Sequence, residues 1–245
     1  MTRLLAIDTS SAWCSVALSL GEEAPRIRHE LVSAGASQLL LPWVDDLLAQ
    51  ANLRLENLDA IAVGIGPGAF TGVRLGIAAV QGLAIAAKLP VLPVASLDAI
   101  AAQVIHSSKF LQHQVKHFVV AIDARMDEVY WAKYAFDANH PFSATRLGQI
   151  HLCKPEQVDL SGAQYIAGSA IKAYGTRLFI QEDISLDAQD ADLGISALGI
   201  LSCAKQMFKN HLAVDVHHLE PLYVRDKVAL TTDERNALFN QGATS

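Results

Sequence analysis

The sequence has little of the features that mark disulfide-bonded proteins and nucleic-acid-binding proteins. Its three cysteines, Cys14, Cys153 and Cys203, are odd in number, far apart and in no C-x-x-C pair. A disulfide framework and a cysteine zinc site are therefore not expected. Lysine and arginine number 19 against 25 acidic residues, which leaves a net charge of −6 at pH 7. Because affinity for nucleic acid comes largely from neutralising phosphates with basic side chains, independent binding to RNA or DNA is disfavoured.

Long apolar segments are also lacking. A membrane helix needs roughly 20 apolar residues, whereas the longest nearly uninterrupted run, Leu75 to Ala87, is shorter and contains Gln81 and Gly82. This run predicts a buried helix. The apolar residues at positions 4–7 are too few for the apolar region of a signal peptide, which has roughly 7 to 15 residues. We therefore expect a cytoplasmic protein without a membrane span.

The composition and the periodicity predict a compact α/β protein. Of the 245 residues 51% are apolar and 18% are charged, which excludes disorder as the main state. Alternating or wholly apolar runs predict strands, and apolar spacings of three and four predict helices. The expected strands of the first half are 3–7, 13–20, 26–31 and 61–65, and the expected helices are 39–51 and 71–88.

The second half repeats the order of the first. Ala121-Ile122-Asp123 and the strand after it echo the opening of the chain, and the run Tyr165 to Phe179 echoes the strand, glycine turn and helix near Gly66. Two β-β-β-α-β-α halves point to a duplicated actin-like ATPase (ribonuclease H-like) fold with two lobes, residues 1–108 and 109–245. A helix near 196–209 closes the pattern, and its packing back on the first lobe is one option.

Candidate cofactor-binding residues are Asp8, Gly66, Gly68 and Asp123. Both aspartates end the first strand of their half and are expected to face the cleft between the lobes, where they could hold magnesium and a nucleotide phosphate. The two glycines precede a helix whose first N–H groups and dipole favour an anion. The alternatives are turn-forming aspartates and a structural strand-to-helix turn.

No metal site and no catalytic residue are predicted. His113 and His117 have the spacing of two metal ligands on a helix, but they directly precede the expected strand 118–122 and have no third ligand nearby. We interpret them as part of a solvated connector. No serine lies in a G-x-S-x-G motif, which excludes the common α/β-hydrolase nucleophile.

Small residues recur along one side of the predicted helix after the glycine turn. Gly72, Gly76 and Ala79 let another backbone approach closely, either from a second subunit or from the protein's own sheet, and the spacing alone leaves both open. The helix 39–51 carries more apolar residues than one buried stripe needs. If the two helices form an intersubunit contact, replacing Gly76 with leucine should abolish association and leave the fold unchanged.

Seven segments together resemble the bacterial TsaB (YeaZ) family, and the resemblance extends from the first strand to Arg225. They are Ile7-Asp8-Thr9-Ser10, Cys14-Ser15-Val16-Ala17-Leu18, Leu40-Leu41-Pro42, the block Gly66 to Gly76 (GPGAFTGVRLG), Gln81-Gly82-Leu83-Ala84, the block Asp123 to Tyr130 (DARMDEVY) and Pro221-Leu222-Tyr223-Val224-Arg225. The glycine block and the Asp-Ala-Arg block are highly specific in combination.

The resemblance implies a non-catalytic subunit of a tRNA-modifying assembly. Members of the family pair with a homologous catalytic subunit, TsaD, and an ATPase, TsaE, which move a threonylcarbamoyl group to the adenosine beside the tRNA anticodon. The catalytic relative holds a metal with a His-x-x-x-His pair, whereas the corresponding stretch here, Ser96 to Ala101, has no histidine. The family also commonly has His-Ser where this chain has Ala36-Ser37. No cofactor is therefore expected, and tRNA would be bound only through the complex.

The family's helical contact implies a set of interface residues, which would serve the heterodimer or, without the partner, a homodimer. The expected interface residues are Leu40, Val44, Leu47, Gly72, Gly76, Ala79 and Leu83. The competing hypothesis is an enzyme acting alone, either an actin-like phosphotransferase that uses Asp8 and Asp123 with magnesium-ATP, or a metallopeptidase. A homodimeric module with another partner is a third interpretation.

Overall fold

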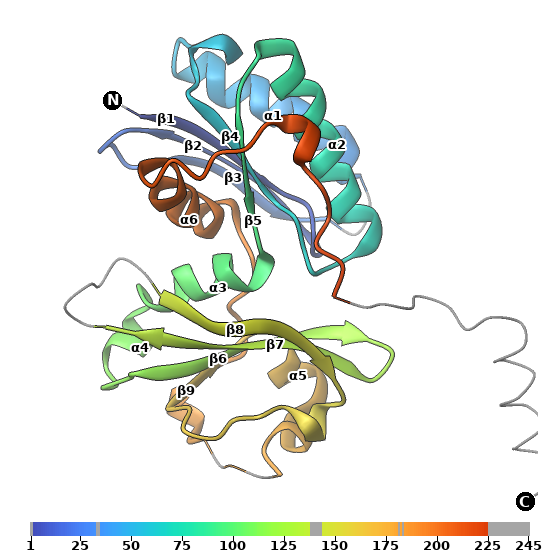
Figure 1. Ribbon diagram of the computed structural model, residues 1–245, viewed down its shortest axis with the longest axis vertical. Helices are drawn as coiled ribbons and strands as arrows, with labels where there is room; N and C mark the ends of the chain where they lie inside the picture. Colours follow the sequence, from blue (N-terminus) through green and yellow to red (C-terminus); the bar gives the residue numbers. More distant parts are fainter. Residues whose placement is uncertain (1, 33–34, 138–143, 181, 183, 225–245) are drawn as a thin grey trace, which may run out of the picture.

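The computed structural model describes residues 2–32, 35–137, 144–180, 182 and 184–224. Two lobes lie one above the other, and each is built on a five-stranded sheet (Figure 1). The first sheet contains β1 (Arg3–Asp8), β2 (Trp13–Leu20), β3 (Arg26–Leu31), β4 (Ala60–Gly64) and β5 (Val91–Val94). The second contains β6 (His117–Arg125), β7 (Glu128–Phe136), β8 (Ala144–Cys153), β9 (Tyr165–Ala167) and β10 (Gln189–Asp190).

The two sheets have the same topology. Their strand orders are β3-β2-β1-β4-β5 and β8-β7-β6-β9-β10. In each sheet the first three strands are antiparallel, and the last two run parallel to the first strand. This agreement confirms the duplicated fold that the sequence repeat predicted.

The helices are distributed unequally between the lobes. They are α1 (Ala36–Gln50), α2 (Phe70–Ala87), α3 (Ser96–Val104), α4 (Ser108–Leu111), α5 (Ala170–Tyr174) and α6 (Ala197–Lys209). Where the first half has α1, the described part of the second half has only the 3₁₀ turn Pro155–Gln157. The described part of the second lobe therefore lacks a counterpart of the long helix α1.

Alternation along β1 divides the interior into two hydrophobic cores. Leu5 and Ile7 face α1 and α2, which cover one side of the first sheet. Leu4 and Ala6 face the other side, where α6 packs (Figure 1). All four side chains are fully buried, because period-two alternation sends neighbouring residues to opposite faces of a covered sheet.

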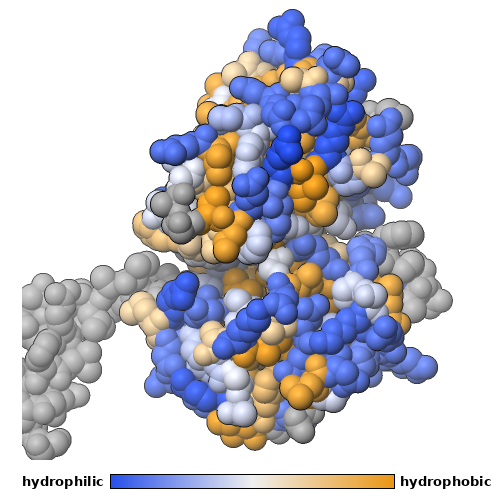
Figure 2. Space-filling view, turned by 180° about the vertical axis from the view of Figure 1, so that it is seen from behind, coloured by the Kyte–Doolittle hydropathy of each residue, from blue (hydrophilic) through white to orange (hydrophobic). Residues whose placement is uncertain are grey.

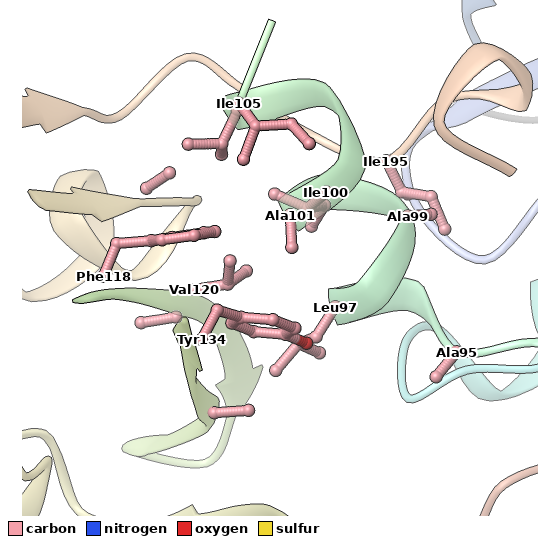
Figure 3. Packing of buried hydrophobic residues seen from close by; sticks show 14 of the residues in the cluster. Ala95, Leu97, Ala99, Ile100, Ala101, Ile105, Phe118, Val120, Tyr134 and Ile195 are labelled. Carbon is pink, nitrogen blue, oxygen red and sulfur yellow. The ribbon is translucent and has the colours of Figure 1, made fainter. Parts of the chain in front are cut away.

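Helix α3 lies between the lobes and joins their interiors. Figure 3 shows its side chains Leu97 and Ile100 on the side of the second-sheet residues Phe118 and Tyr134. The Tyr134 hydroxyl also donates a hydrogen bond of 2.7 Å to Asp98 Oδ1 on this helix. The core on this side of the first sheet is therefore continuous with that of the second lobe.

The chain returns to the first lobe after β10. Helix α6 packs against β1, β4 and α3, and Gly199 lies so close that a Cβ there would be 2.2 Å from the carbonyl oxygen of Ala99. The following segment pairs Val214 with Val91 of β5, and the N–H of Leu222 donates to the carbonyl of Ile65 at 2.8 Å. The first lobe thus includes residues from both ends of the described chain.

Two residues of α6 test this packing. Ile200 is fully buried against the first sheet, whereas Leu198 is 39% exposed. Ile200→Ala should lower the free energy of unfolding by roughly 3 kcal/mol because it leaves a cavity. Leu198→Ala should cost less than about 1 kcal/mol, since little apolar area is lost at an exposed position. Urea unfolding of both variants checks this, and equal losses would contradict the packing described for α6.

Candidate functional site

The glycine-rich turn between β4 and α2 packs directly on the turn that follows β1. The turn contains a cis peptide bond between Gly66 and Pro67, and Gly66 has a φ of +96°. A Cβ at Gly68 would lie 2.4 Å from the carbonyl oxygen of Ser10, and one at Gly72 would lie 1.9 Å from that of Thr9. The small residues are therefore needed for contact within this chain.

Several of the predicted interface residues are internal. Leu40, Val44 and Leu47 of α1 are 1–2% exposed and belong to the core beneath α1 and α2. Gly76 is buried, with its Cα facing Thr9 and Val63. The expectation that these side chains contact a partner was wrong, because their spacing marks the face that covers the protein's own sheet. Gly76→Leu would disturb the fold.

The exposed side of α2 is nevertheless uncharged. Ala78, Gly82, Ile85 and Ala86 are exposed, with Ile85 58% exposed, while Ala79 and Leu83 are partly buried. Among the described residues, α2 is the one helix whose length and composition would allow it to cross a membrane. It packs on the sheet through its other side. Its outer side is a surface of low polarity that a protein partner could cover.

The two candidate aspartates have different environments. Asp8 is fully buried beside Gly64 and Ile200, so it does not face an open cleft as predicted. Its Oδ2 accepts from the Ser10 N–H at 3.2 Å, and its Oδ1 has no hydrogen-bond partner among the described residues. Burial raises the pKa of this carboxyl from 3.8 to about 6, against the smaller opposing effect of the hydrogen bonds from Ser10.

Asp123 sits at the β6–β7 hairpin and is engaged by its neighbours. Its Oδ1 accepts hydrogen bonds of 2.8 Å from the Tyr174 hydroxyl and from the Arg125 N–H, and its Oδ2 lies 3.2 Å from the Arg125 guanidinium.

Within the described part of the chain, no group of three or more His, Cys, Asp and Glu side chains could hold a metal ion.

A pocket with a volume of about 230 Å³ lies between the lobes. Figure 2 shows the narrow waist at which the lobes meet. Residues of the glycine turn and the start of α2, of the β6–β7 hairpin and of the segment 221–224 line the pocket. Of the four candidate cofactor residues, only Gly68 is among its lining residues.

Two arginines and three aromatic residues are among the lining residues of this pocket. The Arg74 guanidinium lies 3.3 Å from the centroid of the Phe70 ring and hydrogen-bonds the Tyr223 hydroxyl. Arg125 and Tyr130 line the side that belongs to the second lobe. Two guanidinium groups beside the start of a long helix provide positive potential, so the pocket suits an anionic group.

The hairpin that carries Arg125 has an unusual backbone. Arg125, Met126 and Asp127 all have positive φ angles, between 54° and 62°. Arg177 holds the hairpin through hydrogen bonds of 2.6 and 3.0 Å to the Asp127 carboxylate. Three consecutive residues in the left-handed region are strained, and such backbones concentrate at functional sites. Sequence reasoning missed this pocket, although three of the family-like segments supply its lining.

Comparison with known proteins gives a consistent result. The protein-family model described as TsaD, tRNA N6-adenosine threonylcarbamoyltransferase, matches residues 27–232. Together with the duplicated sheet topology, this match defines a TsaD-like protein of the actin-like, ribonuclease H-like class.

The relatives narrow this class to one family. A protein of Escherichia coli K12 named tRNA threonylcarbamoyladenosine biosynthesis protein TsaB is 36% identical over 93% of this chain and 96% of its own length. Its namesake from Haemophilus influenzae is 35% identical over 92% and 94%. The structure of YeaZ from Pseudomonas aeruginosa superimposes with a TM-score of 0.78 at 36% identity, and covers 91% of this chain and all of its own. The chain belongs to the TsaB (YeaZ) family.

The contact between α2 and the β1–β2 turn can be tested with two glycines of one helix. Gly72→Ala would place a methyl group against a backbone oxygen and should destabilise the protein by roughly 3 kcal/mol. Gly82 has no atom within 4 Å of its Cβ position, so Gly82→Ala should stabilise by about 0.5–1 kcal/mol. Thermal unfolding distinguishes the two, and a harmless Gly72→Ala would be incompatible with this contact.

The buried Asp8 predicts a specific dependence of stability on pH. A carboxyl with a folded pKa of about 6 and an unfolded pKa near 3.8 stabilises the fold at low pH and loses that contribution as the pH rises through about 6. Asp8→Asn removes this loss. The difference in free energy of unfolding between the variant and the wild type should shift in favour of the variant by on the order of 3 kcal/mol between pH 4 and pH 8. A constant difference over this range would show that Asp8 is not buried as described.

Proposed function

We propose that this chain is the non-catalytic scaffold subunit of an assembly that makes threonylcarbamoyladenosine in tRNA. The observation that carries the proposal is the similarity, over more than nine-tenths of the chain, to two proteins named tRNA threonylcarbamoyladenosine biosynthesis protein TsaB. The assembly would transfer a threonylcarbamoyl group to the exocyclic amine of the adenosine next to the anticodon. The proposed place of action is the cytoplasm.

Two features of the first lobe support a non-catalytic role. The stretch that would correspond to the metal-binding His pair of the catalytic relative is α3, where Ser96, Leu97 and Ile100 are at most 1% exposed. This helix joins the interiors of the lobes, so these three side chains pack in the core and are not open to a substrate. Asp8, which a phosphotransferase would need beside its nucleotide, is buried beside Ile200 of α6.

The exposed side of α2 supports a protein partner. From Leu75 to Ala87 this helix carries no charged residue, and its outer positions are small or apolar. Leu41 of α1, on the same side of the sheet, is 47% exposed. Covering such a surface removes apolar area from water without desolvating charge. We assign this surface to contact with the homologous catalytic subunit, TsaD.

The remaining partners follow from the same proposal. The ATPase TsaE would act on the assembled pair, and tRNA would be bound through the complex, because the chain itself carries a net charge of −6. Without its partner the chain would cover the α2 surface with a second copy and form a homodimer.

The experiment measures threonylcarbamoyladenosine in bulk tRNA by nucleoside mass spectrometry after depletion of this protein in its host. Wild type should restore the modification, and Ile85→Glu should restore less than about a tenth, because it places a charge in the contact surface. The matched control is Leu186→Glu, at an 82% exposed position of the second lobe. It should behave as wild type.

Binding measurements complete this test. Ile85→Glu should weaken co-purification with the catalytic subunit at least tenfold without changing the thermal unfolding of the chain. Unchanged modification after depletion would overturn the proposed function. A rise in melting temperature with millimolar magnesium-ATP, in the isolated chain, would favour the phosphotransferase alternative instead.

A further inference from the structure

Strand β3 forms an open edge of the first sheet. In the described part of the chain it pairs with β2 alone. The N–H of Val32 donates to the carbonyl of Ala12, and this hydrogen bond identifies which residues of the third strand bond to β2. Since hydrogen-bonding residues alternate along an antiparallel strand, the even-numbered residues of β3 bond to β2. Ile27, His29 and Leu31 therefore direct their N–H and C=O groups away from the sheet.

The side chains of β3 differ between its two faces. Ile27 is 36% and Leu31 is 65% exposed, and both lie on the face where Trp13 of β2 is 37% exposed. His29 lies between them, stacked on the Trp13 ring at 4.5 Å and hydrogen-bonded to Ser15 Oγ at 2.9 Å.

The opposite face of β3 is charged. Arg28 and Glu30 are exposed there, and Arg28 also pairs with Asp46 of α1. An edge strand is an open template for another strand, and it is selective when its side chains match only one neighbour.

The pattern of β3 is complementary to itself in one register. An antiparallel copy must bring outward-bonding residues opposite one another, which allows two-fold axes at residues 27, 28, 29 or 30 when at least three residues of β3 overlap. An axis at 27 would oppose Arg26 with Arg28 of the copy. An axis at 28 would oppose Arg28 with Arg28 of the copy, and an axis at 30 would oppose two Glu30 side chains. An axis at His29 pairs Ile27 with Leu31, and Arg28 with Glu30, each of them twice.

We propose that β3 is an association surface at which two copies of this chain join their first sheets into one antiparallel sheet centred on His29. The occupant is a second copy because the apolar pair and the ion pair both match in the same register. This contact is separate from the outer side of α2, so it does not depend on the function proposed above. The two contacts together would link more than two chains.

A charge exchange tests the proposal, and it is made in an Ile85→Glu background so that contact through α2 does not contribute. The association constant is measured by sedimentation. Arg28→Glu alone and Glu30→Arg alone should each weaken self-association at least tenfold, because each places like charges opposite one another. An equimolar mixture of the two variants should regain association. In a mixed dimer both acidic side chains of one chain lie opposite the basic side chains of the other, at positions 28 and 30.

Two controls keep the result decisive. Arg54→Glu reverses a charge at an 84% exposed side chain of the same lobe and should leave self-association unchanged. Recovery in the mixture also excludes misfolding of the single variants. A background protein that stays monomeric at the highest concentration, or a mixture that does not recover, would overturn the proposal. The proposal would also be overturned if the charge variants changed association only after a different protein was added. That result would indicate that β3 pairs with a strand of another protein.

The register has a direct readout through cysteine cross-linking. His29→Cys should give a disulfide-linked dimer under oxidation, because hydrogen-bonded antiparallel partners have Cα atoms about 5.5 Å apart, within the range of a disulfide. Leu31→Cys should not cross-link, since residue 31 lies opposite residue 27 of the copy. The unsubstituted chain reports the background from its own three cysteines. Equal cross-linking at positions 29 and 31 would exclude the proposed register.

Discussion

The close approach of α2 to the turn after β1 is the constraint on which the first lobe depends. A carbonyl oxygen of Thr9 occupies the place where any side chain at position 72 would begin, at 1.9 Å. This contact fixes the start of α2, and with it the glycine turn that lines the interlobe pocket. It also sets which side of α2 faces outward. The candidate partner surface and the candidate anion pocket are therefore two results of one backbone contact.

The two features that support the proposed non-catalytic role are both buried in this chain. Helix α3 joins the two interiors, and Asp8 is enclosed beside Gly64 and α6. A buried, partly unpaired carboxylate destabilises the fold at neutral pH, so its presence is not explained by stability. In the described part of the chain an uncharged helix surface, a pocket with two arginines in its lining and a sheet edge are open to solvent. These features suit recognition and support the proposed scaffold role.

Local periodicity predicted much of this fold and less of the site. The alternation in β2 and the repeat between the halves predicted the order of the elements along the chain, because alternation depends on neighbouring residues and the second half shows the same order again. The interface prediction failed at Leu40, Val44 and Leu47, whose spacing of four and three is that of the buried stripe; Leu41, one position away, is the exposed residue. The pocket was out of reach because Arg74 and Tyr223 meet only after folding, from distant parts of the described chain.

The return of the chain to its first lobe has a consequence for biosynthesis. The sheet that begins at Arg3 is covered by α6 and bordered by Val214 and Leu222, which leave the ribosome last among the described residues. A chain that ends before α6 would leave that side of its first sheet uncovered, and it would lack the segment that contacts α2 near Leu219. On the proposed contact through α2, such a chain would present an incomplete surface to the partner. Synthesis of this late segment would then precede assembly.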